Sequence, residues 1–305
     1  LDLEFSVLPS SGRRAISENL PIVLGCSHAC AYCVIPHRRG GERSRDAGKI
    51  IKEAEELVAQ GTREIVLLGQ IVDRYGLDLP GSPHLPELLD SLSQIPDLKR
   101  IRFLTSHPNW MTDALIETVA NNPKVMPHIE VPIQAGDDAI LQAMRRGYTS
   151  QEYRDLVAKL REKIPGVSIG TDIIVGFPGE TEAAFQNTEA LLRDLQLDVV
   201  HLARYSPRPQ TYSARFLADD VTAAEKMRRF RVLETLQEQI LTDLNAKFEG
   251  TVQSVLFEAK AKDRWRGRTP TNRLVFVESD ENLRGQDRDV RIDWTGPWSL
   301  LGELA

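Results

Sequence analysis

The stretch "GCSHACAYC", residues 25–33, contains every cysteine of this 305-residue chain. Cys26, Cys30 and Cys33 are separated by three and then two residues, and the interpretation of the whole sequence starts from this spacing. Three thiols cannot all pair into disulfides, and packing alone does not explain three cysteines within eight residues. The stretch therefore predicts a bound metal group with one coordination position that no cysteine fills.

Two kinds of metal group are compatible with three thiolates. A structural zinc ion needs four ligands, and His28 or His37 could supply the fourth. An iron–sulfur cluster normally has four cysteine ligands, so three leave one iron open for a cofactor such as S-adenosylmethionine (SAM). The spacing by itself leaves both alternatives open.

Composition narrows the class of protein. The chain is 41% hydrophobic and 27% charged, which is ordinary for a globular protein. Its formal net charge of -6 provides no global basic field, so any RNA contact must come from local patches. No apolar run approaches a membrane span. Three close thiols without further cysteines favour a reducing compartment, and we predict the cytoplasm.

Short apolar runs alternate with amphipathic helical stretches about six times after residue 20. The runs are PIVLG (21–25), EIVLLGQ (64–70), RIRFLTSHP (100–108), HIEVPIQAG (128–136), VSIGTDIIVGFPGE (167–180) and VVHLARYSPRP (199–209). Such alternation predicts right-handed βαβ units around a parallel sheet, and therefore the α/β class. Six units are too few for an eight-fold barrel, so we expect an open partial (β/α)6 barrel whose site lies at the carboxyl ends of the strands.

Local signals refine the helices and the C-terminal part. Thr112, Ser150 and Thr181 are predicted N-caps. Residues 221–247 are predicted to form a long charged helix. From Gly250 onward, β-branched residues alternate with turn signals, which predicts a small all-β barrel.

The motifs resemble those of a known superfamily. CxxxCxxC after a first strand, with Tyr32 before the last cysteine, resembles the radical SAM superfamily. The stretches GCSHACAYCVIPHRRGGERSR, LLGQ, TSHP, VPIQAGDDAILQAMRRGYTSQEY, TDIIVGFPGET and YSPRP, in this order, resemble the methylthiotransferases within it. GRTPTNRLVFVE resembles the RNA-binding TRAM domain. The resemblance implies a linker remnant at 1–20, a radical SAM domain at 21–245 and a TRAM domain at 246–305.

The resemblance also implies cofactors and an activity. Cys26, Cys30 and Cys33 would hold a [4Fe-4S] cluster whose open iron binds SAM, and electron transfer would release a 5′-deoxyadenosyl radical. Family members usually carry a second [4Fe-4S] cluster on a preceding domain, which we expect to be missing here by truncation. The implied reaction is methylthiolation of C2 of N6-isopentenyladenosine beside the anticodon of tRNA. Alternatives are threonylcarbamoyladenosine in tRNA, a ribosomal protein, or a zinc-stabilised RNA-binding protein that is not an enzyme.

The strand ends supply the predicted cofactor contacts. By resemblance, Tyr32 packs beside SAM, backbone groups of Gly69 and Gln70 hold its ammonium, and an arginine pairs with its carboxylate. The remaining candidates follow later strands. His107 is expected to support the site without contacting the cofactor. The full cofactor set is Tyr32, Gly69, Gln70, Ser106, Gln134, Arg145 (with Arg146 as the other choice), Asp172 and Gly176, with Gly179 beside it. No protein base is assigned. Ile71 stands where the family has Asn.

Basic stretches supply the predicted RNA contacts. KAKDRWRGR surrounds an aromatic residue with cations, a combination suited to loop RNA; its members are Lys260, Lys262, Arg264, Trp265, Arg266 and Arg268. HRRGGERSR places Arg38, Arg39, Arg43 and Arg45 near the mouth of the site. KMRRFR, residues 226–231, is either an RNA contact or a solvated helix face. The predicted partners are a tRNA anticodon stem-loop and an electron donor such as flavodoxin or ferredoxin. We expect the protein to be a monomer and not to contact a membrane.

Overall fold

Six parallel strands form the main body of the protein. The computed structural model describes residues 15–81 and 84–305. The strands are β1 (Ser17–Pro21), β4 (Glu64–Leu68), β5 (Arg100–Phe103), β6 (His128–Glu130), β7 (Ser168–Val175) and β8 (Val199–Arg204). They pair as two ladders, β1-β4-β5 and β6-β7-β8. A bridge between Ile101 and Val125 and a hydrogen bond from Ser106 N to the Glu130 carbonyl (2.9 Å) join the two ladders.

The first strand begins earlier than predicted. The sequence suggested residues 21–25, but β1 ends at Pro21, and 23–24 instead form β2 (Val23–Leu24), antiparallel to β3 (Arg43–Ser44). Ile16, Leu20 and Ile22 are all buried, so the apolar run extends into the segment expected to be a linker. The predicted linker, 1–20, therefore overlaps β1; its residues 1–14 lie outside the described part of the chain.

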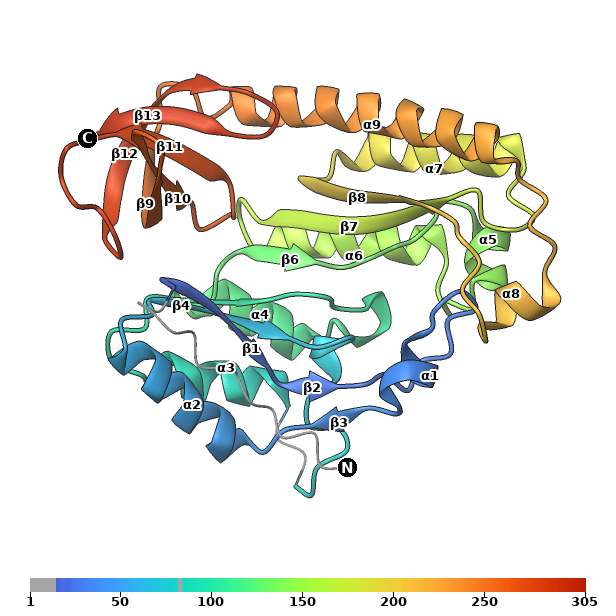
Figure 1. Cartoon of the computed structure of the whole chain (residues 1–305), viewed down its shortest axis with the longest axis horizontal. Coiled ribbons are helices and arrows are strands. Elements are labelled where there is room, and N and C mark those ends of the chain that lie inside the picture. Colours follow the sequence, from blue (N-terminus) through green and yellow to red (C-terminus); the bar gives the residue numbers. More distant parts are fainter. Residues whose placement is uncertain (1–14, 82–83) are drawn as a thin grey trace.

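Amphipathic helices cover the outside of the strands (Figure 1). They are α2 (Ala47–Ala59), α3 (Leu85–Ser93), α4 (Asp113–Asn121), α5 (Asp138–Ala143), α6 (Ser150–Lys163) and α7 (Glu182–Leu195). Thr112 and Thr181 cap α4 and α7 as predicted. The predicted cap Ser150 is wrong: Thr149 caps α6, because Glu152 bonds back to the Thr149 backbone and completes a capping box one residue earlier.

Short elements line the edge where the strands end. They are α1 (Ile35–Arg39) and α8 (Tyr212–Phe216), and the 3₁₀ turns η1 (Val72–Arg74) and η2 (Pro108–Trp110). Figure 1 shows α1, α5 and α8 together at this edge. The site that the sequence predicted at the strand ends therefore lies among these elements.

A long helix leads to the C-terminal barrel. Helix α9 (Ala223–Ala246) contacts β8 and ends at the barrel (Figure 1). The barrel strands are β9 (Val252–Ala261), β10 (Arg264–Arg268), β11 (Leu274–Glu278), β12 (Asp287–Thr295) and β13 (Leu300–Leu304), closed in the order β10-β11-β13-β12-β9. The predicted partial (β/α)6 barrel with a small β-barrel is confirmed. No helix among residues 15–81 and 84–305 is long and apolar enough to cross a membrane.

The small barrel is attached at the amino ends of the strands. Arg100, the first residue of β5, donates to the Arg268 carbonyl (2.6 Å) and pairs with Asp287 (2.5 Å). Asp198, just before β8, pairs with Arg273 (2.8 Å). Because parallel strands share one direction, this attachment lies at the opposite end of the sheet from the cysteine stretch.

Candidate functional site

The cysteine loop is held by close backbone contacts. Gly25 has φ +68°, and a Cβ there would lie 2.2 Å from the Gly41 carbonyl oxygen. Cys26 N donates to the Gly40 carbonyl (3.1 Å), so residues 40–41 lie directly against the start of the loop. Only glycine tolerates both this backbone conformation and this approach. The loop therefore depends on Gly25 for its course.

Cys30 has the most polar surroundings of the three thiols. Its Sγ lies 3.4 Å from His28 Nδ1 and accepts a hydrogen bond from Arg146 Nη1 (3.1 Å). Burial raises the pKa of Cys30, but the His28 hydrogen bond and the Arg146 charge outweigh it and leave the pKa at about 7. Burial raises the pKa of Cys26 and of Cys33. The Cys30 thiolate is thus the form that this environment favours most strongly.

Two adjacent arginines point to different places because of one backbone turn. Arg145 has φ +60°, Arg145 N donates to the Gln142 carbonyl and Arg146 N to the Leu141 carbonyl, which is a Schellman-type end of α5. Arg146 is buried against Cys30, whereas the Arg145 guanidinium lies 3.6 Å from the centre of the Tyr212 ring. Of the two predicted candidates, the structure therefore places Arg146 against the cysteine loop and Arg145 away from it.

Strand β5 ends in two buried polar groups that have no partner among the described residues. Ser106 Oγ and His107 Nε2 are both buried and unbonded. Burial, with the nearby Arg146 charge, lowers the pKa of His107 to about 2, so the ring is neutral. His107 Nδ1 accepts from Asn109 N (3.3 Å), which leaves the proton on Nε2. Buried polar groups are normally satisfied, so these two atoms lack the partner that such groups usually have.

The other predicted contacts sit at the ends of β4, β6 and β7. The Gly69 carbonyl accepts from Thr105 Oγ1 (3.0 Å), and Gln70 follows it. Gln134 is buried at φ +82° and makes no side-chain hydrogen bond to described residues. Burial raises the pKa of Asp172. Ile71, the departure from the family motif, is buried with 6% exposure.

Two predicted residues lie in the GFPGE turn or against it. The Tyr32 ring meets Phe177 edge-on at 6.4 Å. Gly176 has φ +71°, and the space beside it is filled by Lys226 from α9, whose Cγ would lie 2.3 Å from an added Cβ. The close approach expected from a ligand at Gly176 is thus made by a protein side chain. Arg229 reaches the same turn through Glu180 (2.7 Å).

The donor set fits an iron–sulfur cluster with SAM better than zinc. No group of three or more His, Cys, Asp or Glu side chains in the described part of the chain is arranged to hold one metal ion. A zinc site requires such convergence, whereas in a cubane each cysteine binds a different iron. Arg146, Ser106 Oγ and His107 Nε2 add a cation and two unbonded polar atoms from neighbouring strand ends. These groups suit the carboxylate and polar groups of SAM.

The predicted RNA contacts in the small barrel need one correction. Trp265 is 8% exposed and belongs to the barrel core, so it is not a stacking surface. Residues alternate inward and outward along β10, and Trp265 falls on the inward face. Lys260 and Lys262 are exposed, but Arg264 pairs with Glu278 and both Arg266 and Arg268 pair with Glu258.

The two other basic stretches behave differently from each other. In 226–231, Lys226 pairs with Asp219 while Arg228 and Arg229 pair with Glu225, so this stretch mainly holds α9 in place. Near the cysteine loop, Arg38, Arg39 and Arg43 are exposed and have no carboxylate partner among the described residues. Arg45 instead pairs with Glu53.

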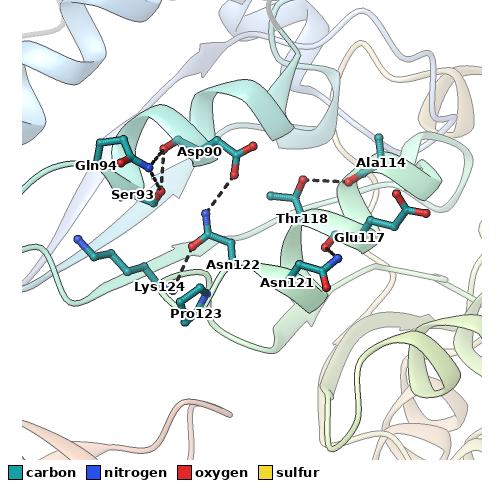
Figure 2. A pocket seen from close by; sticks show the side chains of 10 residues that line it. All are labelled: Asp90, Ser93, Gln94, Ala114, Glu117, Thr118, Asn121, Asn122, Pro123 and Lys124. Atoms are coloured by element: carbon teal, nitrogen blue, oxygen red, sulfur yellow. Dashed lines mark hydrogen bonds between the residues drawn. The ribbon is translucent and has the colours of Figure 1, made fainter.

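A surface hollow elsewhere carries no comparable chemistry. About 850 Å³ lies between the ends of α3 and α4 (Figure 2). Its side chains bond to neighbouring backbone or to each other, as Asn122 does with Asp90 (3.1 Å). Both helices end here before the next strand begins, so the hollow faces away from the cysteine loop. We assign it no function.

Sequence reasoning missed two features of the site. The sequence indicates His28 only as a possible zinc ligand, yet its ring contacts Cys30 and lies against the His107 ring, with ring centres 4.6 Å apart and planes tilted by 35°. Glu130 and His201 face each other at 3.6 Å across β6 and β8, and Asp172 is paired in register with His201. Polar residues inside predicted buried strands were the available signal for this second group.

Comparison with known proteins identifies the family. Residues 20–192 match the model of the radical SAM superfamily and residues 246–305 that of the TRAM domain. Coproporphyrinogen III oxidase from Escherichia coli, a radical SAM enzyme, has a similar fold, with a TM-score of 0.57 at 13% identity over 86% of this chain and 68% of that one. TsrM from Kitasatospora setae matches with a TM-score of 0.55 at 18% identity, over 79% and 42%.

Curated relatives are much closer in sequence. A protein of Roseiflexus named tRNA-2-methylthio-N(6)-dimethylallyladenosine synthase is 52% identical to this chain, over 95% of this chain and 62% of the relative. A protein of the same name from Dehalococcoides mccartyi is 48% identical, over 95% of this chain and 69% of the relative. The chain thus spans about 62% of the length of the Roseiflexus relative. The cysteine loop, the six strand ends and these matches agree, and the chain belongs to the radical SAM superfamily, in the family of the tRNA-2-methylthio-N(6)-dimethylallyladenosine synthases, with a C-terminal TRAM domain.

Proposed function

We propose that this chain is the SAM-cleaving and RNA-binding part of a tRNA methylthiotransferase that modifies C2 of N6-isopentenyladenosine beside the anticodon. The observation that carries the proposal is Arg146 buried against Cys30, next to two unbonded polar groups at the end of β5. Relatives at about half identity carry that activity in their names. Residues 21–245 would bind the cofactors and 246–305 would contribute to RNA binding.

Each residue of the site has a distinct role in this proposal. Cys26, Cys30 and Cys33 hold a [4Fe-4S] cluster, which when bound supplies the electron for reductive cleavage of SAM. Arg146 faces the SAM carboxylate, since its guanidinium is the buried cation at the loop. The Tyr32 ring, which meets Phe177 edge-on, would pack beside SAM.

Sulfur insertion needs a group outside these residues. All three cysteines of the chain are used at one site, so we place the second [4Fe-4S] cluster outside the 305 residues. An external one-electron donor such as flavodoxin or ferredoxin would reduce the first cluster. On this view the chain acts as a cytoplasmic monomer that retains SAM cleavage and lacks thiolation.

The test is anaerobic reconstitution with iron and sulfide, followed by dithionite and SAM, with 5′-deoxyadenosine as the product measured. We expect product from the wild type, none from Cys30→Ala, and a raised KM for SAM in Arg146→Gln. Arg145→Gln is the matched control and keeps the wild-type KM. A colourless protein that binds zinc and cleaves no SAM would overturn the proposal in favour of a zinc-stabilised RNA-binding protein.

Substrate choice is tested separately. Anticodon stem-loops that carry isopentenyladenosine or threonylcarbamoyladenosine are compared for affinity, and the first is expected to bind more tightly. Tighter binding of the second would assign the chain to the other tRNA branch. Binding of neither would favour the ribosomal protein substrate.

A further inference from the structure

Helix α8 presents aromatic rings to solvent beside the cysteine loop. Phe216 is 62% exposed and Tyr212 is 38% exposed, and their ring centres lie 5.0 Å apart. Isolated exposed apolar residues need no explanation, but a pair of adjacent aromatic rings on a five-residue helix does. Neither ring was part of the sequence-based prediction of RNA contacts.

The position of α8 is rigidly tied to the cysteine loop. Ser213 N donates to the carbonyl of Ala31 (2.8 Å), and Ala31 lies between Cys30 and Cys33 in the sequence. Ser213 Oγ also accepts from Tyr205 Oη (3.0 Å), and Thr211 caps the helix through Ala214 N. Ser213 and Thr211 are fully buried. Helix α8 is therefore held against the cysteine loop, and Figure 1 shows it near α1 and α5.

Each ring is accompanied by an arginine. Arg145 lies 3.6 Å above the Tyr212 ring, and Arg215 lies 5.2 Å from the Phe216 ring. Arg145 occupies a left-handed conformation that usually belongs to glycine, which directs its side chain onto Tyr212 while Arg146 turns inward. The result is a continuous row of guanidinium, two rings and a second guanidinium.

The surrounding positive charge is not neutralised by the protein. The exposed arginines at this edge lack a carboxylate partner among the described residues; they are Arg38, Arg39, Arg43, Arg145, Arg204, Arg208 and Arg215. By contrast, Arg264, Arg266 and Arg268 in the TRAM domain all pair with glutamates. In a chain of net charge -6, this edge is a local basic surface.

Unneutralised arginines beside exposed rings are the combination that binds single-stranded nucleic acid, since phosphates meet the cations and bases stack on the rings. We propose that the α8 platform, formed by Tyr212 and Phe216 with Arg145 and Arg215, stacks a base of the single-stranded loop next to the reacting nucleotide. This inference rests on the proposed function and specifies where the RNA loop lies. A protein partner for this surface would instead need carboxylates to meet the arginines and apolar area to cover the rings.

The experiment measures affinity of the full chain for a labelled anticodon stem-loop by fluorescence anisotropy over a series of salt concentrations. Phe216→Leu keeps apolar surface but removes the ring, so affinity is expected to fall by about 5- to 150-fold, as for the loss of one stacked base. Phe216→Trp retains binding. Leu77 is as exposed as Tyr212 but aliphatic, so Leu77→Ala is the control. This variant is expected to bind RNA as tightly as the wild type.

Arg145→Gly separates binding from folding. Glycine relieves the positive φ, so the unfolding midpoint is not expected to fall. Affinity for RNA is expected to weaken, and the slope of log K against log salt to become shallower by about 0.7 if one phosphate contact is lost. A variant with normal affinity and normal slope would show that Arg145 does not contact RNA.

The outcomes distinguish the two proposals. If the wild type binds RNA and Phe216→Leu binds equally well, the stacking platform is wrong while the proposed function stands. Normal RNA binding by Phe216→Leu and weakened binding by Leu77→Ala would likewise overturn it. If the wild type binds no anticodon stem-loop, the RNA part of the proposed function fails and this inference fails with it.

Discussion

Replacing Arg102 is expected to damage the contact between the two domains severely. Arg102 on β5 is 2% exposed, and its Nε lies 2.8 Å from Oε2 of Glu64, itself 4% exposed. Its other two nitrogens donate to the Pro270 and Thr269 carbonyls, both at 2.8 Å. One guanidinium therefore neutralises a buried carboxylate and satisfies two carbonyls of the TRAM domain.

Arg102→Met removes the cation and leaves the Glu64 charge buried. Loss of one partner of a buried ion pair costs about 3–5 kcal/mol, a large fraction of the roughly 5–15 kcal/mol that stabilises a domain. The double variant Arg102→Met, Glu64→Leu removes the stranded charge, but the two carbonyls lose their donors and Ser17 Oγ loses its acceptor on Glu64 (2.8 Å). At about 1 kcal/mol for each carbonyl and less for the half-buried Ser17, we expect a loss of about 2–3 kcal/mol for the double variant.

Urea unfolding followed by two signals tests this expectation. Three of the four tryptophans lie in the TRAM domain, so fluorescence mainly reports that domain, while far-ultraviolet circular dichroism mainly reports the helices of the α/β domain. In Arg102→Met the fluorescence transition is expected to shift to lower urea and to separate from the helical one. A loss below about 1 kcal/mol, or a double variant as unstable as the single one, would refute the reasoning.

Three further predictions concern single residues. Gly25→Ala is expected to cost at least about 2 kcal/mol and to lower iron bound on reconstitution, whereas Gly166→Ala, at a similar φ of +73° with open space around it, costs less. Burial raises the pKa of the Asp73 carboxyl to about 7, so the stability that its neutral form gives the folded state is lost as pH rises from about 4 to 7. The free energy of unfolding of the wild type should therefore decline over this range, and that of Asp73→Asn should not. An equal decline in the variant would contradict this prediction. Trp265→Phe is expected to leave RNA affinity unchanged in an anisotropy titration, because the ring lies in the barrel core; a clear loss without unfolding would restore the stacking role.

Features that depend on residues close in sequence were predictable. Five of the six predicted strands and the caps Thr112 and Thr181 come from local patterns and were confirmed, whereas the first strand lies earlier than its apolar run predicted. The cap of α6 was misplaced by one residue because Thr149 and Ser150 are both good caps, and Glu152 favours the earlier one. The orientation of Trp265 was also contained in the alternation along β10, although a cluster of cations obscured it.

Properties that depend on which distant residues meet could only come from the tertiary structure. The sequence alone determined the spacing of the three cysteines, the order of most strands along the chain and the presence of a second domain, because each is encoded within a short stretch of residues. Tertiary structure decided that Arg146 rather than Arg145 meets Cys30, that His28 lies on His107, and that α8 stands beside Ala31. It also decided which arginines are neutralised. Arg264 pairs with Glu278 on the neighbouring strand, whereas Arg145 lies on the ring of Tyr212, more than 60 residues away in the sequence. Pairing between side chains that lie far apart in the sequence depends on how distant segments pack, and a local pattern does not specify it.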